Sequence, residues 1–227
     1  MAFIEDLSWV EVKRGIDAGL PVLIPIGAQA KAHGPHLPMR TDYLTARALS
    51  ARIDKAYPLL VAPVVGLGHY PAFTSFAGSQ SVSSDVFKAM LAQSMALLIA
   101  QGARKLALLN TGVSTERPVD AAAGTVRDAH GVAPVVAHMR LLGGSGRAML
   151  DNPEGGHADE HETSLMLAIA PDRVRLDLAV AAMPDAETQF ARTAATGDAR
   201  KATAAKGEAL LAAMVDDMVA LLRRSFG

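Results

Sequence analysis

Short apolar runs that alternate with stretches of helical period are the feature that most constrains how this chain can fold. The runs occupy residues 22–26, 59–65, 106–109 and 133–137, and they are rich in Val, Ile and Leu without interleaved polar residues. Strands of this kind are typical of parallel sheets that are buried on both faces, because each crossover connection lays a helix over the sheet. We therefore predict an α/β fold with three layers, α/β/α, around a mostly parallel central sheet.

The 227 residues are enough for one substantial core, and no repeat or long linker divides them, so we predict one domain over residues 1–227. Apolar periodicity and capping residues predict helices over residues 8–17, 42–56, 84–101, 116–130 and 200–223, and a further helix that begins near Asp159. Residues 143–156 and 185–199 are predicted to be irregular surface loops.

Charge and composition narrow the classes of function. Basic residues number 22 and acidic residues 23, so the net charge of −1 gives no large field that would attract nucleic acid or an anionic membrane. The first twenty residues lack a signal peptide pattern, and no segment is apolar enough to span a bilayer, which predicts a cytoplasmic protein. The chain has no cysteine, so any metal site must be built from His, Asp and Glu.

The first concentration of polar residues follows the run at 22–26 and precedes a predicted helix. It contains His33, His36 and Asp42, and it should lie at the carboxyl end of a strand, where open parallel sheets bind ligands. Imidazole and carboxylate groups suit zinc, manganese or iron. The alternative is that Asp42 caps the next helix and that the histidines are incidental surface residues.

The second concentration places five ionisable groups within the six residues 157–162. If this segment is helical, His157, Glu160 and His161 have spacings i, i+3 and i+4, and they share one face. The same letters fit the H-x-x-E-H pattern of inverted zinc peptidases. The alternative is a solvated first helical turn whose acidic residues complement the helix dipole.

Between these concentrations, residues 108–116 run from a strand through a glycine turn into a helix. Thr111, Gly112 and Ser114 are candidates to hold a carbonyl or carboxylate of a small ligand, and the alternative is that Ser114 or Thr115 simply caps the helix that begins at Glu116. Tyr70 is a candidate for lining a pocket beside the sheet edge, and ordinary packing is the alternative.

These segments, in this order, resemble the creatininase family of amidohydrolases. The family pattern is P-x-G-x-x-E-Q-H-G-x-H-x-P-x-x-T-D, then N-G-H-G-G-N, then H-A-G-E-x-E-T-S, and the counterparts here lie within residues 25–42, 110–115 and 157–164. The likeness continues through residues 76–78 and 202–210, so it covers nearly the whole chain.

The resemblance implies a hydrolase of cyclic amides, formamides and related C–N bonds, with one or two divalent metal ions and a homo-oligomeric, often hexameric, assembly. It implies metal-ligand roles for His33 and Asp42, a place near the substrate for His157, and an active-site carboxylate in Glu160. The implied mechanism is attack of a metal-activated water on an amide carbonyl, with His157 as the general acid. His36 and Tyr70 are assigned to substrate binding beside the glycine turn.

Two departures from the family pattern affect this expectation. The glutamate before the H-G pair is replaced by Lys31 or Ala32, and the segment 110–115 has no histidine. One resolution is a rearranged mononuclear site of His33, Asp42, Glu160 and His161. Another is that the Lys31 ammonium stands where a metal would sit in relatives and acts on the substrate itself.

The sequence therefore leads to a metal-dependent amidohydrolase of a small molecule, with zinc as the first choice of ion and manganese or iron as alternatives. A ligand-binding or structural homologue that has lost its metal is the second hypothesis, and a metallopeptidase is the third. The expected partners are a small-molecule substrate and further copies of this chain, up to a hexamer.

Overall fold

The computed structural model describes residues 3–227 and is built on a four-stranded parallel sheet. The strands are β1 (Val22–Ile26), β2 (Leu60–Val61), β3 (Leu106–Asn110) and β4 (Val135–His138), in the order β2-β1-β3-β4. In the register, Leu23 lies opposite Val61 on one side and Ala107 on the other. This arrangement confirms the predicted parallel sheet.

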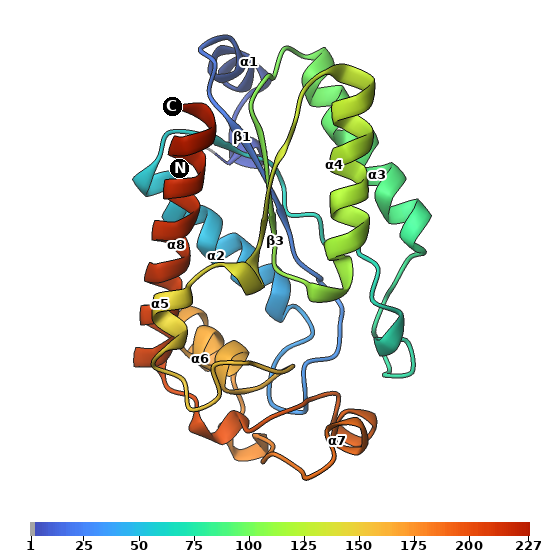
Figure 1. The fold of residues 1–227 in the computed structure, drawn as a ribbon, viewed down its shortest axis with the longest axis vertical. Helices are drawn as coiled ribbons and strands as arrows, with labels where there is room; N and C mark the ends of the chain where they lie inside the picture. The colour runs from blue at the N-terminus through green and yellow to red at the C-terminus, as the bar shows by residue number, and fades with distance from the viewer. Residues whose placement is uncertain (1–2) are drawn as a thin grey trace.

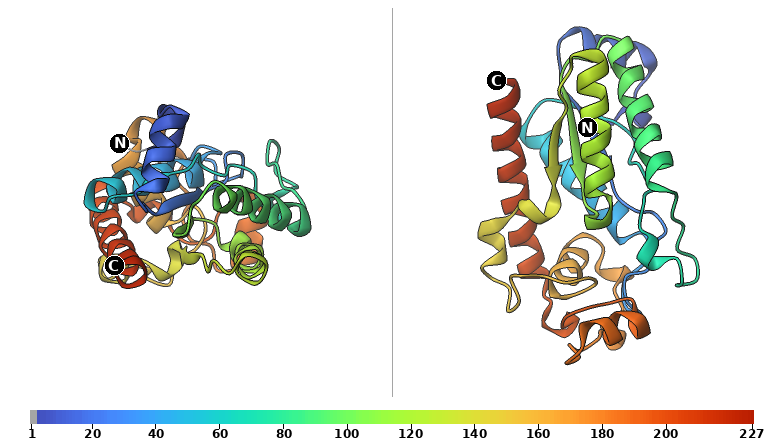
Figure 2. Two further views of the ribbon diagram at one scale, coloured as in Figure 1. Left: turned by 90° about the horizontal axis from the view of Figure 1, so that it is seen from above. Right: turned by 45° about the vertical axis from the view of Figure 1, so that its right-hand side comes forward.

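Helices cover both faces of the sheet, as predicted (Figures 1 and 2). Their bounds are α1 Trp9–Asp17, α2 Thr41–Ala56, α3 Ser84–Ala100, α4 Glu116–His130, α5 Gly144–Arg147, α6 Glu160–Ile169, α7 Ala186–Thr193 and α8 Ala204–Phe226. Successive residues of β3 enter different cores. Leu106 and Leu108 pack with α3 and α4, whereas Ala107 and Leu109 pack with α2 and α8.

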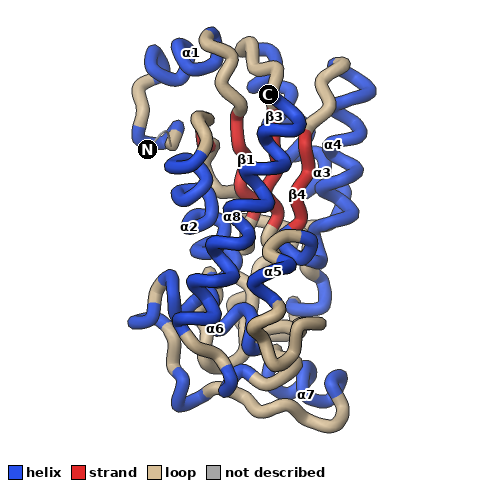
Figure 3. Tube along the Cα trace, turned by 60° about the vertical axis from the view of Figure 1, so that its left-hand side comes forward, coloured by secondary structure: helices blue, strands red, loops and turns tan. Residues whose placement is uncertain are grey.

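The route of the chain creates a crevice at the carboxyl edge of the sheet. The chain leaves β1 into α2 on one face, and it leaves the neighbouring strand β3 into α4 on the other face. Ligands of open α/β sheets bind at such a switch point. Helices α5, α6 and α7 and the loops around them gather at this end of the molecule (Figures 1 and 3).

Three expectations about elements differ from the structure. The predicted strand at 59–65 is reduced to β2, because Pro63 has no N–H to continue a ladder; only Val65 returns to bridge Ile26. The predicted loops at 143–156 and 185–199 contain α5 and α7. Asp185 starts α7, since its carboxylate accepts hydrogen bonds from the backbone N–H groups of Glu187 and Thr188.

Within residues 3–227, none of the helices combines the length and apolarity that crossing a bilayer requires.

Candidate active site

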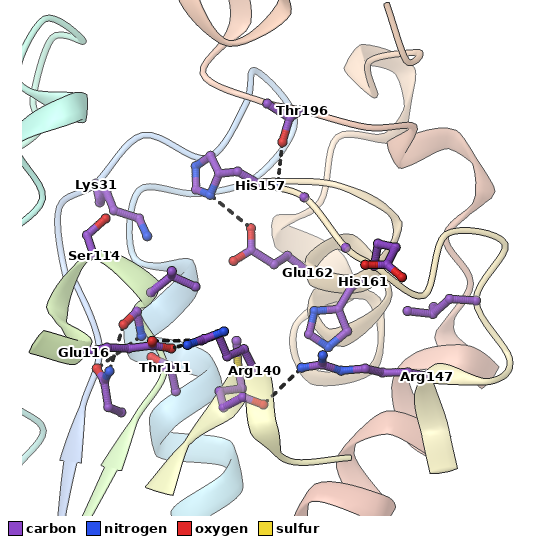
Figure 4. A pocket seen from close by; sticks show the side chains of 18 of the residues that line it. Lys31, Thr111, Ser114, Glu116, Arg140, Arg147, His157, His161, Glu162 and Thr196 are labelled. Carbon is purple, nitrogen blue, oxygen red and sulfur yellow. Dashed lines mark hydrogen bonds and ion pairs between the residues drawn. The ribbon is translucent and has the colours of Figure 1, made fainter. Parts of the chain in front are cut away.

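The candidate site lies at the carboxyl edge of the sheet and is built by the loop after β1, the turn after β3 and the segment that enters α6 (Figure 4). Gly27 allows this close assembly. A Cβ atom at Gly27 would lie 2.4 Å from the backbone oxygen of Asp42 and 2.9 Å from Thr111 Oγ1. Only glycine therefore lets the end of β1 pass under the first turn of α2, which carries Asp42 into the site.

Asp42 is the centre of a buried charge cluster. Its Oδ2 lies 2.7 Å from Lys31 Nζ, and its Oδ1 lies 2.9 Å from His33 Nε2. All three residues are at most 5% exposed. Burial alone would raise the pKa of Asp42, but the charges of Lys31 and His33 outweigh it and hold the pKa well below its usual range. The carboxylate is thus ionised and already neutralised by this chain's own side chains.

His33 is held in a defined orientation by the backbone. Its Nδ1 lies 2.8 Å from the carbonyl oxygen of Lys31, so Nδ1 donates a hydrogen bond and Nε2 is the nitrogen directed into the site. Nε2 also faces Asp42 Oδ1. The ring can therefore contact both the Lys31 oxygen and Asp42 in two ways: with a proton on each nitrogen, or with a proton on Nδ1 and a cation at Nε2.

His157 is oriented in the same way from the opposite side. Its Nε2 donates to the carbonyl oxygen of Ala32 at 2.8 Å, which leaves Nδ1 facing Glu162 Oε2 at 3.4 Å. Glu162 in turn accepts a hydrogen bond from the backbone N–H of Ala158, a residue in the left-handed region with φ of 49°. The His33 and His157 rings lie 4.7 Å apart between centroids.

Burial and neighbouring charge set the protonation of this pair. Burial lowers the pKa of His157 to about 4, although Glu162 acts in the opposite direction, so the imidazole is neutral near pH 7. For Glu162, burial would raise the pKa, but His157, His33 and Lys31 produce a net lowering. A neutral imidazole and an ionised carboxylate are the forms that bind metal ions.

Glu160, which the sequence assigned to the site, faces away from it. Its carboxylate accepts hydrogen bonds from the backbone N–H groups of Asp151 and Asn152 and pairs with Lys206 on α8. The reason is that α6 begins only at Glu160, with Asp159 as its N-cap. His157 therefore precedes the helix, and the expected shared face of His157, Glu160 and His161 does not form. The structure does not bring His33, Asp42, Glu160 and His161 together at one point.

The other predicted residues are distributed around the site. Lys31, Thr111, Gly112, Ser114, His157 and His161 line the main cavity, which has a volume of about 370 Å³. The Thr111 hydroxyl is occupied by the backbone oxygens of Ile26 and Asp42. Thr115, not Ser114, is the N-cap residue of α4, and it makes no side-chain capping bond.

His36 and Tyr70 lie outside the lining of this cavity. His36 is buried, and its Nε2 lies 2.8 Å from the Thr163 hydroxyl. Tyr70 is also buried, and it borders a small hollow beside Lys31 and Asp42 that has a volume of only about 10 Å³. Neither side chain lines the main cavity, and their assignment to substrate binding stays a prediction.

Sequence reasoning missed several charged groups that line the cavity, among them Glu162, Arg140 and Arg147. Glu162 belongs to the H-A-G-E-x-E-T-S motif. Helical spacing favoured Glu160 instead, because the sequence does not fix the exact residue at which α6 begins. The arginines gave no signal: Arg147 lies in residues 143–156, which were expected to be an irregular loop, and Arg140 lies just before that segment.

The residues fit one metal ion. His33, His157 and Glu162 each offer a ligand atom, and these atoms lie within 4.8 Å of one another. Each histidine donates its other ring nitrogen to a backbone carbonyl, which is the usual way that a ligating imidazole is oriented. A second ion does not fit beside Asp42, because the Lys31 ammonium already occupies the free side of that carboxylate.

Comparisons with known proteins by family profile, by sequence and by structure each match most of this chain. The family profile described as creatininase, creatinine amidohydrolase, matches residues 5–222. The creatinine amidohydrolase of Pseudomonas putida is 28% identical over 99% of this chain and 97% of its own length. The mycofactocin precursor peptide peptidase of Mycobacterium ulcerans (strain Agy99) is 30% identical over 89% of this chain and 84% of its own.

A solved structure of creatininase in a manganese form shares the fold. It superimposes with a TM-score of 0.87 at 23% identity, over 99% of this chain and 98% of that one. The match of the family profile to nearly all of the sequence, together with the shared architecture, shows that this chain belongs to the creatininase family.

Proposed function

We propose that this protein is a metal-dependent amidohydrolase that cleaves the C–N bond of a small cyclic amide or formamide-like compound. The observation that carries the proposal is the convergence of His33, His157 and Glu162 at the wall of a cavity large enough for a small molecule. Solved creatininases include a manganese form and a Zn–Zn form, which supports the proposal that this chain binds a divalent ion. Zinc is our first choice for this chain.

In this proposal the chain holds a single ion through His33 Nε2, His157 Nδ1 and Glu162. Three protein ligands with one open position are characteristic of catalytic rather than structural zinc sites. When bound, the ion would supply Lewis acidity for an amide carbonyl and for a water molecule. The backbone oxygen of Lys31 holds His33 in position through Nδ1, and the Ala158 N–H does the same for Glu162.

His157 can ligate the ion or act as a general acid, but one nitrogen atom cannot do both. Its Nε2 is committed to the Ala32 carbonyl, so only Nδ1 faces the cavity. We therefore place His157 among the ligands instead of retaining it as the general acid.

Metal content tests this assignment directly. We would measure zinc, manganese and iron by plasma mass spectrometry on protein purified without a chelating tag, and again after zinc loading and dialysis. The wild type should bind about one equivalent, and Glu162→Gln and His157→Ala should lose it while circular dichroism shows an intact fold. His161→Gln is the matched control and should retain the metal. Loss in His161→Gln with retention in Glu162→Gln would instead support the site that the sequence suggested.

The creatinine amidohydrolase and the precursor peptide peptidases are named for different substrates, so the activity screen needs both classes of substrate. Creatinine and related cyclic amides, formamides and short peptides should be offered to the zinc-loaded protein, with products identified by mass. Cleavage of cyclic amides or formamides supports the proposal. Cleavage of peptides alone would favour the peptidase branch of the family.

A second candidate is a ligand-binding homologue that works without metal. The Lys31–Asp42 pair favours it, because a buried ammonium 2.7 Å from the carboxylate supplies a positive charge within the chain itself. A wild-type protein that takes up no metal after loading would overturn the hydrolase proposal and leave this candidate.

A further inference from the structure

Two cavity-lining residues on the far side from Lys31 have polar atoms without partners. His161 is 8% exposed, and its Nε2 is buried with no hydrogen-bond partner; Arg147 Nε is in the same condition. Figure 4 shows the His161 ring directed toward the Arg147 guanidinium, and both residues line the main cavity. Buried polar atoms without a partner are rare in proteins and call for an explanation.

Arg147 also lacks a counter-ion, unlike the other long cations of the cavity. Arg140 Nε is paired with the Glu116 carboxylate at 2.6 and 2.8 Å, and Lys31 is paired with Asp42. Arg147 makes one hydrogen bond, from Nη2 to the backbone oxygen of Met139 at 3.2 Å. Within residues 3–227, no carboxylate lies within ion-pair distance of it.

The field of the Asp159 carboxyl reaches Arg147, but the two side chains form no ion pair, and burial lowers the pKa of the Arg147 guanidinium. A half-buried guanidinium without a full negative partner favours the arrival of an anion.

We propose that Arg147 and His161 form a subsite for a carboxylate of the molecule that occupies the main cavity. The guanidinium fork would donate from Nε and Nη2, and the His161 imidazole would donate from Nε2. A neutral imidazole still has one N–H to give. One arginine and one neutral histidine match a planar monoanion better than a phosphate dianion.

The same subsite indicates a class of substrate, an inference that rests on the proposed function. Glu162 and the Arg147–His161 subsite border one cavity, so a molecule that is bound by a carboxylate at the subsite would present another part to His33, His157 and Glu162. The substrates would then be amides that bear a carboxylate, such as N-acyl or N-formyl amino acids, rather than neutral cyclic amides.

The test compares two probes that differ only in charge. Binding of N-acetylglycine and of N-acetylglycinamide to the metal-free protein would be measured by isothermal titration calorimetry and by NMR. The carboxylate should bind at least about tenfold more tightly than the carboxamide, the ratio expected of a charge-assisted hydrogen bond. Arg147→Gln should remove this preference, and Arg147→Lys should keep only part of it, because lysine retains the charge but lacks the fork.

Two control variants make the result specific. Arg173→Gln removes an exposed arginine outside the cavity and should leave the preference unchanged. Arg140→Gln should retain most of it, because Arg140 is already paired with Glu116. A preference that survives in Arg147→Gln, or that is lost only in Arg140→Gln, would overturn the subsite, and so would equal binding of the two probes to the wild type.

Failure of the subsite can be distinguished from failure of the proposed function. A carboxylate preference that depends on Arg147 in a protein that never hydrolyses an amide supports the subsite and contradicts the hydrolase. Hydrolysis of neutral and charged amides at equal kcat/KM, with no difference in probe binding, supports the hydrolase and contradicts the subsite.

Discussion

Lys31 shows how one substitution redefines the centre of the site. It lies in the loop after β1, at one of the two positions that the resemblance sets against the family glutamate, and its side chain is buried against Asp42 and over the Phe73 ring, with Nζ 5.0 Å from the ring centroid. A cation in place of a carboxylate reverses the local charge. The Asp42 carboxylate therefore has an internal partner, and an ion at His33, His157 and Glu162 would have a positive neighbour instead of a negative one.

Removing this internal cation should cost stability. We expect Lys31→Met to lower the free energy of unfolding by about 3–5 kcal/mol, because it leaves a buried carboxylate with only His33 as a partner. Urea denaturation at pH 7 measures the change. The control is Lys13→Met, which breaks the exposed pair with Asp17 and should cost only about 0.3–0.5 kcal/mol. Equal losses in the two variants would show that the Lys31 pair is not buried as described.

His36 should make stability depend on acid pH. Burial lowers its pKa from 6.5 to about 4, so between these values the unfolded chain binds a proton that the folded chain does not. The stability contributed by neutral His36 is present above pH 6.5 and is lost as the pH falls toward 4. Urea denaturation from pH 7 to 4.5 should show a shallower decline for His36→Gln than for the wild type. Parallel declines would contradict the assignment.

At the scale of elements, the crossing of α6 and α8 determines which side chains reach the site. Gly207 in α8 lies against the backbone of Ser164 in α6, where a Cβ atom would approach the Ser164 oxygen to 1.9 Å. The next residue toward the N-terminus, Lys206, pairs with Glu160. This contact turns Glu160 away from the cavity and leaves Glu162 on the inner side.

The Gly207→Ala substitution should therefore be strongly destabilising. The added methyl group collides with backbone rather than with a movable side chain, so we expect a loss of several kcal/mol or a failure to fold. Gly124→Ala in α4 is the matched control. Its Cβ meets nothing closer than 3.9 Å, and the higher helix propensity of alanine should stabilise the protein by up to about 1 kcal/mol. Thermal melting followed by circular dichroism compares the two, and equal melting temperatures would contradict the close crossing.

At the scale of the whole molecule, large apolar side chains remain exposed on one helical layer. Trp9 on α1 is 80% exposed, and Val86 and Leu97 on α3 are 57% and 61% exposed. Exposed apolar surface of this kind is common at subunit interfaces. We propose that these helices take part in a homo-oligomer, in line with the family resemblance in the sequence.

Sedimentation equilibrium tests this proposal. The mass should be a multiple of the 23.7 kDa chain, with a hexamer as the expected state. The double variant Trp9→Lys and Leu97→Lys should shift the mass toward the monomer. Leu141→Lys, which changes an equally exposed residue outside α1 and α3, should leave it unchanged. A monomeric wild type at micromolar concentration would contradict the proposal.

Local patterns in the sequence were sufficient for the main strands and the longer helices, and for the edge of the sheet that bears the site. The buried strands β1 and β3 read as continuous apolar runs, and Ser8, Ser83 and Thr203 accept the capping hydrogen bonds of α1, α3 and α8. Because the carboxyl ends of parallel strands meet at one edge, the loop with His33 and the turn with Thr111 had to lie close together.

Only the tertiary structure decided which carboxylate faces the cavity and which cations remain unpaired. Glu160 and Glu162 are two residues apart, and the choice between them depends on Lys206, which is 44 residues further along the chain than Glu162. Likewise, nothing in the local sequence distinguishes Arg140 from Arg147. Glu116 pairs with Arg140, whereas Arg147 Nε has no partner and is free for a ligand. Such pairings are set by the packing of distant helices, and no local period or spacing encodes them.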